Sequence, residues 1–221
     1  WGEILGPRAH EVLRRAQHDE DEAVRAAAAE ASYFTPKEAV ASLQAALMDE
    51  SPAVRRAAAR TIGRLGAEGV PLAARALGDA DPTVLALACV SAGQLGRVEL
   101  CERLKALTKH TDAAVVVAAL EGLSLMGRLT EELLLRASLH ADPEVLKLAF
   151  TLGADRLLLV PRAVGALEHA RWDVRVAAAR LLAVAGGRDA LSPLQDAAAR
   201  EDDPVASDVL ASAIATLSRR L

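Results

Sequence analysis

The chain has 221 residues, of which 52% are hydrophobic and 25% are charged, and its formal net charge is −4. This composition excludes an intrinsically disordered chain, and the acidic balance argues against a nucleic-acid-binding surface, which is normally basic. No apolar run reaches the roughly 18 residues that a membrane-spanning helix requires. We therefore expect a globular protein that binds neither nucleic acid nor membranes.

The residue types also indicate origin and compartment. Only four of the 26 basic residues are lysine and asparagine is absent, a bias that suggests a GC-rich bacterial genome. Cys89 and Cys101 are not in a C-x-x-C pattern, so a reducing compartment is expected. No signal peptide is visible, and we expect a cytoplasmic protein. The chain begins at Trp1, without a methionine, and we expect it to be part of a longer protein.

A short phrase recurs along the chain about every thirty residues. It consists of an acidic residue, often a proline, and then a valine at the start of an alanine-rich run. The valines lie 29 to 31 residues apart at Val24, Val54, Val84, Val115, Val145, Val174 and Val205. A fixed period of this length is the signature of stacked helical repeats. It predicts an all-α solenoid of about seven two-helix units, forming a single repeat domain over residues 1–221.

The second unit illustrates how each repeat divides into two helices. Thr35 to Glu38 has the pattern of a capping box, and Ser51-Pro52 starts the second helix in the same way. That helix is expected to end at Gly66, where a left-handed cap is favoured. Another capping box is expected at Ser192 to Gln195. We predict second helices at about residues 22–33, 52–65, 82–95, 113–126, 143–153, 173–185 and 204–218, with Gly96, Gly127 and Gly186 ending three of them.

Two stretches carry a resemblance to a known family. The runs Val54 to Gly66 and Val174 to Arg180 follow a pattern of valine, arginine and alanines that resembles the HEAT repeat in its short, phycobilisome-lyase-type bacterial form. The resemblance covers nearly the whole chain. It implies a right-handed superhelix whose second helices line the concave side. Most members of the family are scaffolds that recognise proteins or peptides. A few are subunits of phycobilin lyases, and one HEAT-like branch consists of DNA glycosylases.

The arginine that follows the repeat valine is present in only some units. The resemblance suggests that Arg25, Arg55 and Arg175 pair with repeat aspartates and tie adjacent units together. The three middle units instead carry Leu85, Val116 and Leu146. Two interpretations compete: these apolar helices are packed inside the solenoid, or part of their surface lines the groove and binds an apolar partner.

The positions two, six and ten residues after the repeat valine are expected to face the groove, because four-residue spacing places them on one helix face. In the middle units they are Ala86, Val90, Gln94, Val117, Glu121, Leu125, Lys147, Thr151 and Asp155. The central unit is the least polar. A groove with an apolar centre suits an amphipathic helix laid along it.

In the second unit the same positions form a basic ridge. They are Arg56, Arg60 and Arg64, joined farther along the chain by Arg180. The ridge is either an ordinary solvated face or a clamp for carboxylates or phosphates, which bind strongly to bidentate arginine.

Several features of catalytic and metal sites are missing from the sequence. His18, His110, His140 and His169 lie at the ends of first helices, where cations are favoured. Stacked helices would hold them about 10 Å apart, too far to share a zinc ion. No phosphate-binding loop, nucleophile elbow or zinc-protease motif occurs. We expect no catalytic residue, no metal and no cofactor.

Trp172 and the last helix are further candidates for contact with a partner. Trp172 stands where the repeat usually has proline, and its ring is either an exposed hot spot for binding or a cover for the apolar edge of its turn. The last apolar stripe consists of Leu210, Ile214 and Leu217, and it could pair with another copy of the chain to make a homo-oligomer through the terminal repeat.

These observations favour a non-enzymatic scaffold that captures a protein or peptide segment along its concave face. The candidate binding residues are Arg56, Arg60, Arg64, Val90, Val117, Glu121, Leu125, Arg180 and Trp172. A subunit of a bilin-chromophore lyase is the alternative. A HEAT-like DNA glycosylase is disfavoured, because it would require a basic concave surface with aromatic side chains.

Overall fold

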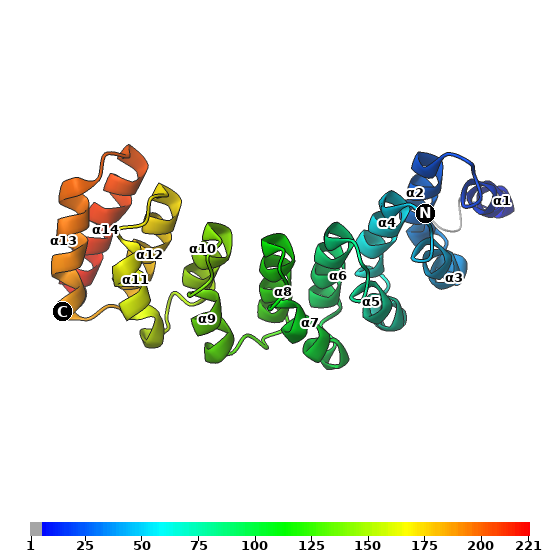
Figure 1. Cartoon of the computed structure of the whole chain (residues 1–221). Helices are drawn as coiled ribbons and strands as arrows, with labels where there is room; N and C mark the ends of the chain where they lie inside the picture. The colour runs from blue at the N-terminus through cyan, green and yellow to red at the C-terminus, as the bar shows by residue number, and fades with distance from the viewer. Residues whose placement is uncertain (1–5) are drawn as a thin grey trace. The chain divides into compact units, whose positions relative to one another are not determined.

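The computed structural model describes residues 6–221, and within them the side chains of residues 11–35 and 38–221. The described residues form fourteen α-helices and no strand (Figure 1). The helices are α1 (Gly6–Ala16), α2 (Glu22–Ala31), α3 (Pro36–Ala46), α4 (Pro52–Ile62), α5 (Val70–Ala76), α6 (Pro82–Leu95), α7 (Cys101–Leu107), α8 (Ala113–Leu125), α9 (Glu131–Ala137), α10 (Pro143–Leu152), α11 (Val160–Ala166), α12 (Trp172–Ala185), α13 (Leu191–Arg200) and α14 (Pro204–Arg220). They follow one another as seven pairs, and the predicted second helices are confirmed to within a few residues. Trp1 lies outside the described residues.

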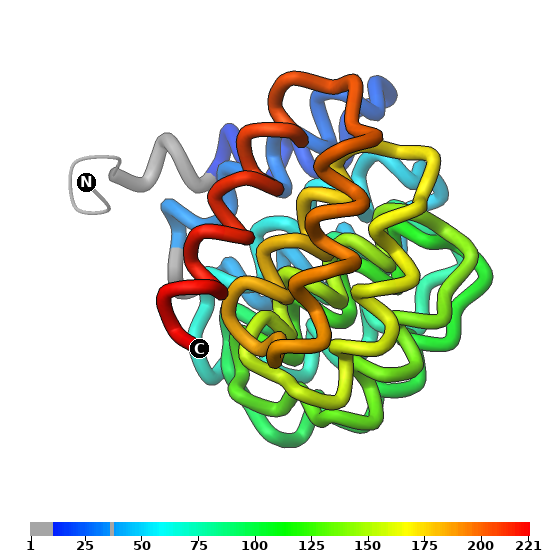
Figure 2. Tube along the Cα trace, turned by 90° about the vertical axis from the view of Figure 1, so that its left-hand side faces the viewer, coloured from blue at the N-terminus to red at the C-terminus, as the bar shows by residue number. Residues whose placement is uncertain are grey.

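The chain divides into two compact units, residues 1–128 and 129–221. In the first unit the second helices α2, α4, α6 and α8 pack side by side in chain order, and in the second unit α10, α12 and α14 do the same. First helices pack against the second helices of their own repeats, as α13 does against α14 (orange and red in Figure 2). No helix among the described residues is long and apolar enough to cross a membrane.

Small residues allow the second helices to pack closely. The alanine runs Ala57 to Ala59 and Ala177 to Ala179 are buried. The approach of α6 to α8 is so close that a Cβ added at Gly93 would lie 2.8 Å from the Cα of Gly122. Leucines and valines fill the rest of the core, which therefore needs few aromatic side chains.

The acidic turns start the second helices as the sequence predicts. The side chains of Asp21, Ser51, Asp81, Asp112, Asp142 and Asp203 each accept a hydrogen bond from a backbone N–H in the first turn of the following helix. The third residue after this cap is buried at Val54, Val84, Val115 and Val145, whereas Val24 of the first repeat is 37% exposed. The last repeat differs, because Val205 is only two residues after its cap. Val205 is 52% exposed and Ala206 takes the buried place, so the predicted repeat valine is wrong there.

Both predicted capping boxes are wrong. The Thr35 hydroxyl donates backwards to the carbonyl of Ser32, at 3.0 Å, and does not cap α3. Ser192 lies inside α13, because the 3₁₀ turn Arg188–Ala190 runs directly into that helix. Short 3₁₀ turns of this kind also precede α3, α5, α7 and α11, where they replace side-chain caps.

The glycines predicted to end second helices behave differently from one another. Gly96 is a left-handed cap with φ of 65°, and Gly66 and Gly127 also have positive φ. Gly66 begins a 3₁₀ turn four residues after α4 ends. Gly186 ends α12 in an extended conformation, and its carbonyl accepts a hydrogen bond from Arg220 at the end of the last helix.

The apolar stripe of the last helix is not available for self-association. Leu210 and Leu217 are fully buried and Ile214 is partly buried, all within the core of the second unit. The expectation that this stripe pairs with another copy is therefore wrong. The stripe packs against the helices that precede it.

Candidate functional site

Two arginines tie their own repeat to the next one. Arg25 donates two hydrogen bonds to Asp49, at 2.8 and 3.0 Å, and Arg55 binds Asp79 at 2.8 and 3.2 Å. The remaining guanidinium nitrogen of each donates to two carbonyl groups in the turn before its own helix. Bidentate pairs of this kind are strong and directional. The predicted pairing with repeat aspartates is confirmed for both.

Arg175 makes the same connection to a glutamate instead of an aspartate. It binds the buried carboxylate of Glu201 at 2.6 and 2.5 Å. The Arg175 guanidinium holds the pKa of Glu201 below its usual range, and Glu201 in turn raises the pKa of Arg175. The predicted pairing with a repeat aspartate is therefore wrong for Arg175, whose partner is a glutamate.

Where the arginine is missing, its carboxylate partner is missing too. After the repeats with Leu85, Val116 and Leu146, the position that Asp49 and Asp79 occupy elsewhere holds His110, His140 and His169. The Nδ1 atom of each histidine accepts a hydrogen bond from the backbone N–H two residues later, at 3.0 to 3.1 Å. Asp49 and Asp79 accept the equivalent bond through Oδ1.

This arrangement corrects the interpretation of the histidines. They act as acceptors that close the turn, and not simply as cations at helix ends. His18 is not equivalent to the others, because Asp19 closes the first turn. Among the residues that the structure describes, no three histidine, cysteine or acidic side chains are grouped so that they could hold a metal ion.

The residues that replace the arginine belong mainly to the core. Leu85 and Val116 are buried, and Leu146 is partly buried against the core of the second unit. The core interpretation therefore holds for these three positions, and the groove interpretation concerns other side chains of the same helices.

Most positions six and ten residues after the repeat valine lie at the surface. In the first unit we name the exposed ones the repeat face: Arg60, Arg64, Gln94, Glu121 and Leu125. In the second unit the equivalent Thr151, Asp155, Arg180 and Val184 are exposed as well. Two large aliphatic side chains occupy the tenth position, Leu125 at 68% exposure and Val184 at 50%. The neighbouring Val90 and Val117 are only partly exposed.

The arginine ridge is engaged by its neighbours. Arg60 pairs with Glu30 of the preceding repeat at 2.8 Å, and the guanidinium of Arg64 stacks over the Tyr33 ring at 3.6 Å. Arg56 makes a long contact of 3.5 Å with a threonine of the next repeat. Arg56 and Arg60 lie on α4 and Arg64 follows two residues after its end, and part of the charge of these arginines is already compensated.

In the second unit a hollow of about 400 Å³ lies between α12 and α14. We call it the α12–α14 hollow; its lining residues are Arg180, Ala183, Val184, Asp208, Val209, Ser212, Ala213 and Thr216. Arg180 was predicted from the sequence. Val184 was missed, although the ten-residue offset applied to the sixth repeat would have found it.

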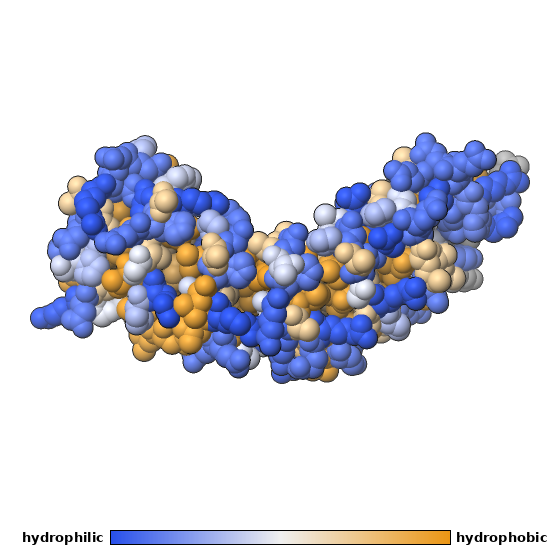
Figure 3. Space-filling view, in the orientation of Figure 1, coloured by the Kyte–Doolittle hydropathy of each residue, from blue (hydrophilic) through white to orange (hydrophobic). Residues whose placement is uncertain are grey.

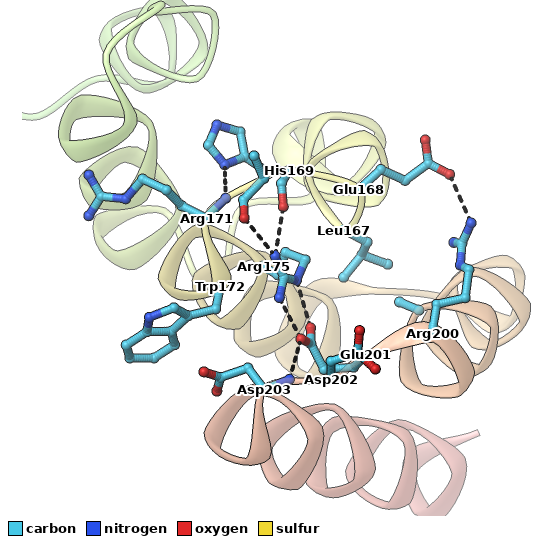
Figure 4. Close-up of a pocket in the computed structure, with 12 residues that line it drawn as sticks. Leu167, Glu168, His169, Arg171, Trp172, Arg175, Arg200, Glu201, Asp202 and Asp203 are labelled. Carbon is cyan, nitrogen blue, oxygen red and sulfur yellow. Dashed lines mark hydrogen bonds and ion pairs between the residues drawn. The ribbon is translucent and has the colours of Figure 1, made fainter.

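A larger cavity, about 870 Å³, opens between the last two turns of the second unit (Figure 4). We call it the turn pocket; it is lined by Leu167, Glu168, His169, Ala170, Arg171, Trp172, Arg175, Ala197, Arg200, Glu201, Asp202 and Asp203. Trp172 is 45% exposed at its rim, so the ring does not simply cover the turn. The repeat pattern does not predict this pocket, because the pocket depends on where α13 ends.

Cys89 is buried in α6, and Cys101 is buried in α7. Burial raises the pKa of the Cys89 thiol to about 12. A thiol in this state is a poor nucleophile at neutral pH. Cys89 is therefore a core residue.

Part of the chain matches a known protein family. The sequence model of the family described as HEAT repeats matches residues 10–71. The match covers less than half of the chain, and the helix pairs that follow it continue at the same period of about thirty residues. The chain contains HEAT repeats, and its seven helix pairs are consistent with a HEAT-like α-α solenoid.

Two solved structures resemble the chain at low sequence identity. The complex of CpcE and CpcF of phycocyanin lyase from Nostoc sp. PCC7120 is 20% identical, with 94% of each chain covered and a TM-score of 0.56. An engineered protein is 19% identical over 95% of this chain and 96% of its own, with a TM-score of 0.43. A search of curated proteins found no match. At such identities the similarity to the lyase complex concerns the fold alone.

Proposed function

We propose that this HEAT-repeat protein is a non-enzymatic scaffold that binds a protein or peptide segment along its repeat face, the side expected to be concave. The observation that carries the proposal is the exposure of Leu125 at the end of α8. The side chain is 68% exposed although most of the residues around it in that helix are buried. Covering a leucine contributes about 1.5–3 kcal/mol, so a partner would gain from this contact.

The polar residues around Leu125 suit a binding role. Glu121 lies one helical turn before it, and the exposed amide side chain of Gln94 holds the equivalent position on α6. An apolar anchor with polar neighbours is typical of protein interfaces. The proposed partner is an amphipathic segment whose apolar side chain packs against Leu125.

The test is selection of peptides on the purified chain. A displayed library of random peptides would be enriched on the wild-type protein, and binding of the selected peptides would then be measured by fluorescence anisotropy. The Leu125→Asp variant should bind them at least about tenfold more weakly. Its helical content, measured by circular dichroism, should be unchanged because the side chain is exposed.

A matched control is available in Leu157→Asp. Leu157 is 74% exposed, but it lies in the turn before α11, where apolar residues gather on the face shown in Figure 3, and not on the repeat face. Peptides that lose binding with Leu157→Asp and keep it with Leu125→Asp would refute the proposed surface.

A second candidate is supported by the similarity to the phycocyanin lyase complex: this chain would be one subunit of a bilin lyase. The similarity also favours protein partners, because that structure is a complex of two proteins. Adding a free bilin to the purified chain and recording the visible spectrum tests the alternative. A change in absorbance that saturates with protein concentration would favour the lyase subunit over a plain scaffold.

A further inference from the structure

The turn pocket exists because the last repeat departs from the geometry of the others. In the sixth repeat α11 ends at Ala166, five residues before the cap residue Arg171, and the other first helices end at the same distance from their caps. In the last repeat α13 continues to Arg200, three residues before Asp203. The chain then leaves in an extended conformation at Glu201. The cavity opens between this turn and the one before it.

The interior of the pocket is apolar at its base. Leu167 and Ala197 are buried there, and the Arg175–Glu201 bridge crosses beside them (Figure 4). Arg200 and Glu168 make a loose ion pair of 3.6 Å at the opposite wall, and both side chains are well exposed. An aliphatic chain can therefore enter the pocket without leaving a buried polar group unpaired.

The charges around the pocket leave an excess of carboxylates. Arg175 is neutralised by Glu201 and Arg200 by Glu168. Arg171 projects away from the pocket (Figure 4), where it binds Glu144 and Asp173. His169 uses its Nδ1 to accept a backbone hydrogen bond. The remaining charged groups are the carboxylates of Asp202 and Asp203.

These two carboxylates differ in what they can accept. One Asp203 oxygen accepts the backbone N–H groups of Val205 and Ala206, which leaves the second oxygen available. Asp202 is exposed, and no described side chain binds its carboxylate. Trp172 projects on the same side of the pocket as the Asp203 carboxylate (Figure 4). An aromatic face beside a carboxylate is a favourable place for a guanidinium or ammonium group.

We propose that the turn pocket is a second docking site, separate from the repeat face, and that it binds a basic segment of a protein partner. One arginine or lysine side chain lies with its aliphatic part against Leu167 and its charge at Asp202. A second cationic side chain stacks on Trp172 beside Asp203. The charge of the pocket and the exposed ring together select a cationic peptide over an acidic one.

The probe is a fluorescein-labelled peptide of about ten residues in which arginine alternates with glycine, and the reference is the same peptide with glutamate in place of arginine. Anisotropy is measured on the whole chain at ionic strengths of about 0.05 and 0.5 M. The basic peptide should bind and the acidic peptide should not. Asp202→Asn and Trp172→Ala should each weaken binding by about threefold to tenfold.

Asp189→Asn is the matched control, since it makes the same change in net charge. Asp189 is exposed in the same unit, but it lies in the turn between α12 and α13 and does not line the pocket. This variant should bind the basic peptide as the wild type does, and so should Leu125→Asp, which separates this site from the repeat face. Equal weakening by Asp189→Asn and Asp202→Asn, or unchanged binding by both pocket variants, would overturn the proposal.

Discussion

Arg55 connects one repeat to the next by donating two hydrogen bonds to Asp79, at 2.8 and 3.2 Å. Both side chains are largely shielded from water. The same guanidinium also donates to the carbonyls of Asp49 and Glu50 in its own turn. One side chain thus holds two turns together, and its replacement by Leu85 in the next repeat coincides with the change from aspartate to His110.

This pairing predicts that the effects of substitutions at Arg55 and Asp79 on stability depend on each other. Arg55→Leu should lower the free energy of unfolding by about 2–4 kcal/mol, because it leaves the carboxylate of Asp79 without its cation. Adding Asp79→His should recover part of the loss, since an imidazole closes the turn in the middle repeats without an arginine. Urea unfolding followed by circular dichroism measures both. Arg162→Leu, at an exposed position of α11, serves as the control and should change stability little. Additive effects of the two substitutions would contradict the pairing.

The Arg175–Glu201 bridge predicts a specific pH dependence. Because the folded pKa of Glu201 lies below its unfolded value, the carboxylate contributes stability above the unfolded pKa. That contribution is lost as pH falls through the lower, folded pKa. Wild-type stability should therefore fall more steeply between about pH 5 and pH 3 than that of Glu201→Gln. Thermal unfolding at several pH values measures the slopes, with the exposed Glu132→Gln as a control that should follow the wild type.

The close contact between α6 and α8 predicts that alanine is not tolerated at its glycines. A Cβ at Gly122 would lie 2.8 Å from the carbonyl oxygen of Cys89, and one at Gly93 would meet the backbone of Gly122. Gly122→Ala should destabilise the protein by about 1–3 kcal/mol, because the helices must move apart. Gly165→Ala is the opposite case, since α11 leaves open space there, and it should stabilise by up to about 1 kcal/mol. Equal midpoints of urea unfolding for the two variants would refute the close packing.

The buried thiol of Cys89 predicts slow chemical modification. Its pKa is raised to about 12 by burial, so little thiolate is present at neutral pH. A thiol-specific reagent should label neither cysteine rapidly in the native protein, and labelling should accelerate across the urea unfolding transition. A Ser218→Cys variant provides an exposed thiol for comparison. Native-state labelling of Cys89 as fast as that of the introduced thiol would be inconsistent with the described core.

The sequence by itself determined the period, the number of helix pairs and most caps of the second helices. These depend on residues close together in the chain: an acidic cap, a proline in the first turn and a valine three residues after the cap. The same local pattern supported the HEAT resemblance and the prediction that Arg25 and Arg55 pair with aspartates. It also placed Leu125 and Arg180 at the surface, because helical spacing alone decides which residues share a face.

Only the tertiary structure decided what happens between repeats. Whether Leu85 and Val116 are core or groove residues depends on the helix packed against them, which local spacing does not reveal. Some repeats have an arginine–aspartate bridge, and others have an apolar residue and a histidine at the same two positions. These positions are about 25 residues apart in the chain, so their relationship is seen only when the turns are stacked. The turn pocket likewise depends on α13 ending two residues closer to the following cap than the other first helices do, a boundary that the sequence pattern did not reveal. Contacts between neighbouring repeats, and not the repeat itself, therefore determine where this solenoid has sites.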